Sequence, residues 1–293
     1  MTAARTLIVL LTGVVAFVPR ASAQRSGPGV PLDTALMTAI VSDSTFTVCP
    51  GVSETHLRYL NKAGKPEAVY ILKARLRRGK LSLEAATPFA RDTFCRQTLM
   101  ESIRWEDTTN HRVIGGVNAD FFDMSNGIPI SMEMTHGKVL KQASRPGRGF
   151  VGVDKRGRVI IGDPALYARR KKSLREALGG DQMLVENGRE LPQADNAFNL
   201  TRHPRTAAGI INARTVLLVV VDGRQPDYSN GMPLGELAHL MKLLGAKTAI
   251  NLDGGGSSTL VSRDASGAWI NRNKPSGHVE RAVANSWIIV ARR

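Results

Sequence analysis

The stretch best suited to chemistry is Asn251-Leu252-Asp253-Gly254-Gly255-Gly256-Ser257-Ser258. An apolar run ends at the carboxylate of Asp253, and three glycines then let the backbone turn through angles that other residues avoid. Such a loop can direct consecutive N–H groups at one point, and the two serine hydroxyl groups add donors. We therefore predict a strand, a tight loop that binds an anion beside one carboxylate, and a second strand. A plain glycine turn would also explain the pattern.

Three other predicted strands also end in polar residues. Asn118 and Asp120 end a buried-type strand and share one face by strand alternation. Pro204 keeps the backbone extended before Arg205, and the apolar strand over residues 215–221 runs into Asp222 and Arg224. If these ends meet, the site holds several carboxylates, two guanidinium groups and a set of N–H donors.

This combination of residues favours a substrate in which a sugar is attached to a phosphate. Arginine forks bind phosphate through two hydrogen bonds, whereas glycosidic cleavage uses a pair of carboxyl groups. Each residue also has a structural interpretation. Asp222 and Arg224 could pair within a turn, and Arg205 could hold a loop in place.

Several motifs, in chain order, resemble those of the phosphodiester glycosidases over roughly residues 50–290. They are Val117-Asn118-Ala119-Asp120-Phe121-Phe122, His203-Pro204-Arg205-Thr206-Ala207, Val221-Asp222-Gly223-Arg224, Gly235-Glu236-Leu237-Ala238, the glycine-rich segment Asn251 to Thr259, and Glu280-Arg281. One departure is Ala74-Arg75-Leu76, which stands where relatives have an aspartate before the leucine.

The resemblance implies an exported hydrolase that cleaves the sugar-to-phosphate C–O bond of a glycosyl-1-phosphodiester. An example is an α-N-acetylglucosamine-1-phosphodiester in a cell-surface or extracellular glycan. We assign catalysis to Asp120, Asp253 and Glu236, although Glu236 could equally compensate a helix dipole. The residues expected to bind substrate or phosphate are Asn118, Arg205, Asp222, Arg224, Gly254, Gly255, Gly256, Ser257 and Ser258.

Three alternative functions remain open at the level of sequence. A phosphodiesterase could bind a divalent cation through Asp120, Asp222 and Asp253 and break the P–O bond. A serine hydrolase could use Ser257 with a histidine, His203 or His239, but the chain has no Gly-x-Ser-x-Gly elbow. A binder of anionic cell-surface glycan would need the arginines and not the carboxylates. No cofactor is required by the sequence beyond this possible cation.

The chain is strongly basic, with a formal net charge of +15. This charge favours anionic partners such as sugar phosphates and acidic glycans. We do not expect nucleic acid as a partner, because the basic residues are scattered and only 5% of residues are aromatic. The sequence leaves the oligomeric state open.

The first 23 residues are typical of a signal peptide. Arg5 precedes an apolar run, and Ala21-Ser22-Ala23 is a small-residue cleavage site. We therefore expect a secreted or periplasmic protein without a transmembrane segment after cleavage. In an oxidising compartment Cys49 and Cys95 could form a disulfide bond, which would stabilise the fold by about 4 kcal/mol; two free thiols are the alternative.

The predicted fold class is α+β, a single domain of many short strands in mixed twisted sheets with a few packed helices. Residues 24–43 are expected to form a leader with a short helix over Leu32–Val41, and residues 44–293 the glycosidase domain. Short alternating segments predict strands at Ser44–Val48, Thr55–Leu60, Ala68–Leu76 and Lys80–Ala85. Helices are predicted around Gln97–Glu101, Lys171–Leu178 and Gly231–Leu244.

Overall fold

The computed structural model describes residues 29–143 and 147–292, so the predicted signal peptide lies outside the described residues. It contains three β-sheets, and every pair of named strands in them is antiparallel. The α+β class with few helices is confirmed. The expectation of mixed sheets is wrong, since no parallel pair joins these strands.

The largest sheet has eight strands in the order β1-β2-β3-β14-β13-β15-β11-β12. Their bounds are β1 (Met37–Cys49), β2 (Val52–Asn61), β3 (Pro66–Arg75), β14 (Thr215–Val221), β13 (Arg205–Asn212), β15 (Thr248–Asn251), β11 (Met183–Glu186) and β12 (Arg189–Glu190). Of the two central strands, β14 is buried from Val216 to Val221 and β13 from Arg205 to Gly209, which explains why the run Val216–Val221 is continuously apolar.

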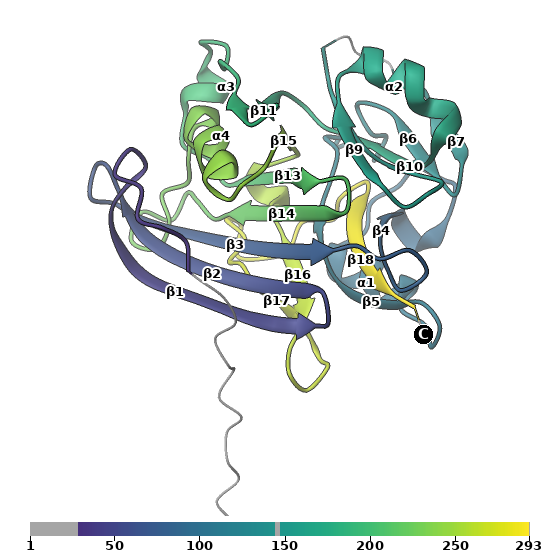
Figure 1. Cartoon of the computed structure of the whole chain (residues 1–293), viewed down its shortest axis with the longest axis horizontal. Coiled ribbons are helices and arrows are strands. Elements are labelled where there is room, and N and C mark those ends of the chain that lie inside the picture. The colour runs from purple at the N-terminus through teal and green to yellow at the C-terminus, as the bar shows by residue number, and fades with distance from the viewer. Residues whose placement is uncertain (1–28, 144–146, 293) are drawn as a thin grey trace, which may run out of the picture.

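Two five-stranded sheets complete the framework, as Figure 1 shows. One has the order β17-β16-β5-β18-β4, with β17 (Trp269–Asn271), β16 (Leu260–Arg263), β5 (Arg112–Asn118), β18 (Ser286–Ala291) and β4 (Leu81–Ala86). The other has the order β7-β6-β10-β8-β9, with β7 (Lys138–Lys141), β6 (Glu133–Thr135), β10 (Leu174–Gly179), β8 (Phe150–Asp154) and β9 (Val159–Gly162).

The α-helices are short and cover separate parts of the sheets (Figure 1). They are α1 (Leu99–Glu106), α2 (Pro164–Arg170), α3 (Ala197–Leu200) and α4 (Leu234–Leu243), and the 3-10 turns are η1 (Pro88–Ala90), η2 (Lys171–Ser173) and η3 (Gly255–Ser257). Thr98 forms a capping box with Glu101 at the start of α1. None of the helices in the described ranges is long and apolar enough to cross a membrane.

One hydrophobic core joins all three sheets. It combines Leu72 of β3 and Leu218 of β14 with Trp287 of β18 and Val151 of β8, all of which are fully buried. A second core lies between the eight-stranded sheet and α4 and includes Val219 of β14 and Leu237 of α4. The shared core makes the described residues one packed unit, with the ends of strands from different sheets held in fixed relation.

Most predicted strands and the helix at α4 are confirmed, but two predicted helices are wrong. Leu32–Val41 contains a turn and then the start of β1, which pairs with β2 along its length. Lys171–Leu178 contains η2 and then β10, the central strand of its sheet, while the helix lies earlier at α2. In both segments pairing with neighbouring strands outweighs local helix propensity.

Candidate active site

The glycine-rich loop connects two different sheets. It leaves β15 of the eight-stranded sheet at Asn251, forms η3, and enters β16 of a five-stranded sheet at Leu260. Asn118, at the end of β5, fixes this loop. Its Nδ2 donates to the carbonyl of Asp253 at 2.6 Å, and its Oδ1 accepts from Thr206 Oγ1 at 2.9 Å and Thr259 N at 3.2 Å. The predicted strand, loop and strand are therefore confirmed, and Asn118 positions the loop.

The backbone N–H groups of the loop are largely used within the protein. Gly255 N donates to Pro204 O at 2.9 Å, Ser257 N to Gly254 O at 3.2 Å and Ser258 N to Gly255 O at 3.2 Å. The last two bonds form because the loop closes into a 3-10 turn, which points its N–H groups back along its own axis, and the first ties the loop to Pro204. The expected array of free N–H donors is therefore not formed by these residues.

The glycines instead leave room for two arginine side chains. A Cβ on Gly255 would lie 3.3 Å from both Nη atoms of Arg224, and a Cβ on Gly256 would lie 2.4 Å from Nη2 of Arg281. Arg281 Nη1 also lies 3.5 Å from Ser257 Oγ. Both arginines are exposed, so their guanidinium groups face solvent over the loop. These two side chains thus place positive charge over the loop.

The two arginines have different surroundings. Arg224 has a left-handed φ of 61°, and its Nη2 lies 3.4 Å from Nδ1 of His203. Arg281 follows Glu280, whose Oε1 accepts from the N–H of Met100 at 2.9 Å near the start of α1. Arg281 was present in the Glu280-Arg281 motif but was not assigned a role from sequence.

Asp120 is almost fully buried, with only 1% of the residue exposed. Its Oδ2 accepts from Ser131 N at 2.8 Å, and its Oδ1 lies 3.6 Å from Nη2 of Arg148. Burial raises the pKa of Asp120 to about 7, against the opposing charge of Arg148, and the nearby charge of Asp253 raises it further. Asp120 therefore holds a proton close to neutral pH.

Asp253 is more open to solvent than Asp120. Burial raises the pKa of its carboxyl group to about 6, while hydrogen bonds from Ser257 and from the N–H of Gly254 and the charge of Arg281 act in the opposite direction. Burial thus raises the pKa of both carboxyl groups above the ordinary range of an aspartate, and that of Asp120 is the higher of the two. One protonated and one ionised carboxyl group is the pairing that acid–base chemistry at a glycosidic bond requires.

Arg148 and two aromatic rings form the adjoining wall. Arg148 Nη1 lies 3.1 Å from Asp181 Oδ1, and the guanidinium carbon stacks 4.6 Å from the ring centroid of Phe121. Phe121 meets Phe198 edge to face at 6.1 Å, and Phe198 is 39% exposed. The exposed aromatic surface suits the apolar face of a sugar ring. Nothing in the sequence pattern singled out Arg148 or Asp181, because both lie in loops that only the fold brings to Asp120.

Arg205 and Glu236 are placed differently from the prediction. Arg205 is 1% exposed, and its guanidinium donates to the carbonyls of Met232 at 2.9 Å, Phe198 at 2.7 Å and Thr201 at 3.0 Å. Glu236 accepts two hydrogen bonds of 2.7 Å from Arg202. The arginine therefore supports the aromatic wall, and the glutamate belongs to an ion pair beside it.

Asp222 helps to hold the glycine-rich loop through the side chain of Asn273. Its carboxylate accepts from Asn273 Nδ2 at 2.8 Å and Lys274 N at 2.8 Å, and the same Nδ2 donates to the carbonyl of Ser258 at 2.9 Å. No ion pair between Asp222 and Arg224 occurs in the described part of the chain. The structure therefore gives Asp222 a role in holding the loop.

The residue sets of two alternative functions, the metal-dependent phosphodiesterase and the serine hydrolase, are not assembled among the described residues. Within residues 29–143 and 147–292 no three His, Cys, Asp or Glu side chains form a metal-binding group, and Asp222 is held by Asn273 apart from Asp120. His239 lies between Asp33 and Glu190, with ring nitrogens 3.1 and 3.0 Å from their carboxylates. No histidine bond to Ser257 occurs in these ranges, so neither proposed set meets at one point.

Cys49 and Cys95 are free thiols, so the predicted disulfide bond is absent from the described residues. Cys49 lines a cavity together with Arg112 at the start of β5, whereas the backbone of Cys95 packs against Gly127, beyond the other end of that strand. A seven-residue strand is roughly 20 Å long. A disulfide bond needs Cα atoms within about 7 Å, and these cysteines therefore cannot pair in this fold.

Comparison with known proteins shows the family and the fold to which the chain is similar. The family model of phosphodiester glycosidase matches residues 111–290. No curated protein matches the chain. Among solved structures, the catalytic domain of zebrafish N-acetylglucosamine-1-phosphodiester α-N-acetylglucosaminidase, auto-inhibited by its pro-peptide, is similar with a TM-score of 0.65 and 19% identity over 86% of this chain and 88% of that one.

Two further solved structures share the fold. A hypothetical protein from Synechocystis has a TM-score of 0.62 and 15% identity, over 86% of this chain and 64% of that chain, so this chain spans less than two thirds of its length. A candidate exported protein from Burkholderia pseudomallei has a TM-score of 0.64 and 14% identity, over 91% of this chain and all of that one.

Proposed function

This chain belongs to the phosphodiester glycosidase family, and from that premise we propose that it hydrolyses the C–O bond between a sugar and the phosphate of a glycosyl-1-phosphodiester. The observation that supports this reaction is the position of two arginines, Arg224 and Arg281, against the glycine-rich loop that begins at the catalytic candidate Asp253. Groups that can bind the phosphate charge thereby lie beside a carboxylate that can act at the glycosidic bond.

In the proposed reaction the phosphodiester binds to the guanidinium groups of Arg224 and Arg281. The sugar lies against the exposed aromatic wall of Phe121 and Phe198. Asp253 is ionised above about pH 6 and supplies negative charge at the anomeric carbon. The C–O bond breaks with its electron pair on the phosphate, whose developing charge the two arginines stabilise.

Asp120 completes the reaction as the proton donor. Its carboxyl group is protonated below about pH 7 and is held by Ser131 and Arg148. A phosphate monoester is a good leaving group, so only modest proton donation is needed as the C–O bond breaks. Water then attacks the anomeric carbon; its oxygen stays on the sugar and its released proton returns to Asp120, which yields the free sugar and a phosphate monoester.

The test uses the purified full chain and three substrates. They are an α-N-acetylglucosamine-1-phosphodiester, a neutral nitrophenyl glycoside of the same sugar, and bis-nitrophenyl phosphate, which has no sugar. We expect turnover of the first substrate only. Arg224→Gln and Arg281→Gln should each reduce its kcat/KM about 10- to 100-fold, because each removes a charge-assisted hydrogen bond. Arg169→Gln, on the exposed surface of α2, is the matched control and should retain activity.

Preferential hydrolysis of bis-nitrophenyl phosphate would contradict the proposal and favour a phosphodiesterase. Equal losses in Arg169→Gln and the two site variants would show that overall charge, and not the site, determines activity.

We further propose that the enzyme acts outside the cytoplasm on an anionic sugar phosphate or glycan. The support is the pattern of residues 1–23, which lie outside the described part, together with the strongly basic composition. Sequencing the N-terminus of protein recovered from the periplasm or the medium tests this location. A mature chain that begins at Gln24 agrees with it, whereas retention of the intact chain in the cytoplasm contradicts it.

A further inference from the structure

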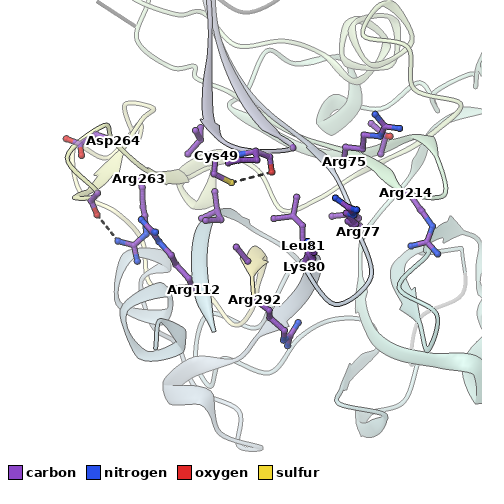
Figure 2. Close-up of a pocket in the computed structure, with 18 of the residues that line it drawn as sticks. Cys49, Arg75, Arg77, Lys80, Leu81, Arg112, Arg214, Arg263, Asp264 and Arg292 are labelled. Atoms are coloured by element: carbon purple, nitrogen blue, oxygen red, sulfur yellow. Dashed lines mark hydrogen bonds between the residues drawn. The ribbon is translucent and has the colours of Figure 1, made fainter. Parts of the chain in front are cut away.

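The structure contains a large cavity far from the candidate active site. It has a volume of about 1210 Å³ and lies between the turn that follows β1, the start of β5 and the ends of β16 and β18 (Figure 2). Small-molecule sites commonly have volumes of about 300–1,000 Å³. The cavity is therefore large enough for a ligand with several functional groups.

This cavity and the candidate active site lie at opposite ends of the same strands. Arg112, at the start of β5, lines the cavity, whereas Asn118, at its end, binds the glycine-rich loop. Thr215 of β14 lines the cavity, and Asp222 follows the other end of that strand. Seven residues of strand separate the two sites by roughly 20 Å, so one small ligand cannot occupy both.

The lining of the cavity is strongly positive. It includes seven basic side chains and one acidic side chain, Asp264, whose carboxylate accepts hydrogen bonds from Ser266 and Ala268 within its own turn. Four of the cations, Arg75, Arg77, Lys80 and Arg112, make no ion pair within the described ranges and are exposed. Like charges gathered without counter-charges raise the local concentration of anions.

Two more arginines are fixed in place by the protein. Arg263 forms an ion pair with Asp107, donates to Gly267 O at 2.7 Å and stacks 3.9 Å from the ring centroid of Trp269. Arg292 binds Glu84 at 2.5 and 3.1 Å. Figure 2 shows Arg263 and Arg112 on one side of the cavity and Arg75, Arg77 and Arg214 on the other. The positive groups thus approach a ligand from two sides.

The floor between these groups is apolar. Leu76, Leu81 and Ile114 lie there and are at most 6% exposed. An inorganic ion would contact only the basic rim, because the apolar floor offers it no hydrogen bond. A ligand with a carbon skeleton between anionic groups would contact both.

We propose that this cavity is a second binding site, for a soluble organic ligand that carries two or more phosphate groups on a carbon skeleton. The phosphates bind the unpaired guanidinium and ammonium groups of the rim, and the skeleton packs on the apolar floor. This site is independent of the proposed hydrolysis, since none of its residues contacts the glycine-rich loop or its two arginines.

Calorimetric titration of the full chain tests the proposal, with fructose 1,6-bisphosphate as the probe and orthophosphate as the comparison. The cavity variant is Arg75→Gln/Arg112→Gln. Its matched control is Arg169→Gln/Arg170→Gln, which removes the same charge from exposed positions on α2. Alkylation of Cys49, which lines the cavity, gives a second measurement, with Cys95 as the internal reference.

We expect saturable one-to-one binding of the bisphosphate, at least about tenfold tighter than that of orthophosphate, because two phosphates are bound together. The cavity variant should bind at least about tenfold more weakly, and the control within about twofold of the original chain. The bisphosphate should slow alkylation of Cys49 and leave that of Cys95 unchanged. Glycosidase activity of the cavity variant should be unaltered.

Several results would overturn the proposal. They are the absence of saturable binding, equal weakening in the two double variants, unchanged binding in the cavity variant, and no protection of Cys49. Loss of binding in Arg224→Gln would place the ligand in the active site instead. Binding only to phosphatidylcholine vesicles that contain phosphatidic acid would indicate a membrane surface and not a soluble ligand.

Discussion

Asp120 and Asp253 are both carboxylates whose pKa burial raises, but their surroundings differ. Asp120 is enclosed and faces Arg148, whereas Asp253 lies at the start of an open loop and is stabilised as an anion by Ser257, Gly254 and Arg281. The higher pKa of Asp120, about 7 against about 6, is the basis on which we propose it as the proton donor. The burial that raises this pKa should also reduce the stability of the folded protein.

Asp120→Asn should abolish activity and stabilise the protein at alkaline pH. The pKa of Asp120 is about 7 in the folded state and 3.8 in an exposed chain, so the folded state binds the proton more tightly. The contribution of this carboxyl group to the free energy of unfolding is fully present below about pH 4 and decreases as the pH rises to about 7. The free energy of unfolding of Asp120→Asn, relative to that of the original chain, should therefore increase by roughly 2–3 kcal/mol between pH 5 and pH 8. Urea denaturation would measure this difference.

Asp123→Asn is the control for that experiment. Hydrogen bonds from Ser125 lower the pKa of this exposed carboxyl group, so its replacement should give no gain at alkaline pH. An advantage of Asp120→Asn that does not change with pH would show that the carboxyl group of Asp120 is not held protonated.

The pH profile of kcat/KM should be bell-shaped, rising through about pH 6 as Asp253 ionises and falling through about pH 7 as Asp120 loses its proton. The charge of Arg281 lowers the pKa of Asp253, so Arg281→Gln should move the acid limb to higher pH and leave the alkaline limb in place. Steady-state kinetics from pH 4 to pH 9 would measure both limbs. A shift of the alkaline limb alone would reverse the assignment of the two carboxyl groups.

At the scale of elements, the glycine-rich loop gives two arginines access to the site. The residues of this loop were identified from sequence, but their role was not. Three consecutive glycines are compatible with free N–H donors and equally with a close approach of side chains. Only the 3-10 turn, and the positions of Arg224 and Arg281 across it, distinguish the two.

Gly256→Ala should reduce kcat/KM at least about tenfold, because its Cβ would lie 2.4 Å from Arg281 Nη2 and displace that side chain. Gly235→Ala, where no atom lies within 4 Å of the new Cβ, is the matched control and should retain full activity. Combining Gly256→Ala with Arg281→Gln should add little further loss, since both changes remove the same contact. Full additivity in this kinetic cycle would contradict the role assigned to Gly256.

Glu236→Gln should retain kcat/KM within about threefold, while the free energy of unfolding falls by about 1–3 kcal/mol. Glu236 and the buried Glu67 share Arg202 at 2.7 and 2.8 Å, which ties α4 to β3. Kinetics and urea denaturation of one preparation would measure both quantities. A large loss of kcat in a variant of unchanged stability would contradict this role and show that Glu236 takes part in catalysis.

Local sequence patterns predicted the strands and α4 well, because alternation and helical spacing record which side of an element is buried. They failed at Lys171–Leu178, whose pairing with β6 and β8 is set by residues far along the chain. They also failed for Arg148 and Asp181, which come together only through the loops between sheets. Sequence identified the polar strand ends, and tertiary structure selects which side chains face the open site.

For the whole molecule, three antiparallel sheets around one core hold the active site at one set of strand ends and the basic cavity at the other. The packed core fixes the distance between the two sites. Because the loop between β15 and β16 crosses from one sheet to another, the geometry of the active site depends on how the sheets pack together.

Hydrolysis of a glycosyl-1-phosphodiester in oxygen-18 water tests the central claim most directly. If Asp120 and Asp253 act at the anomeric carbon while Arg224 and Arg281 bind the departing phosphate, water adds to the sugar. Mass spectrometry should then find the label in the sugar and none in the phosphate monoester. Label in the phosphate would show attack at phosphorus and would contradict glycosidic cleavage by this site.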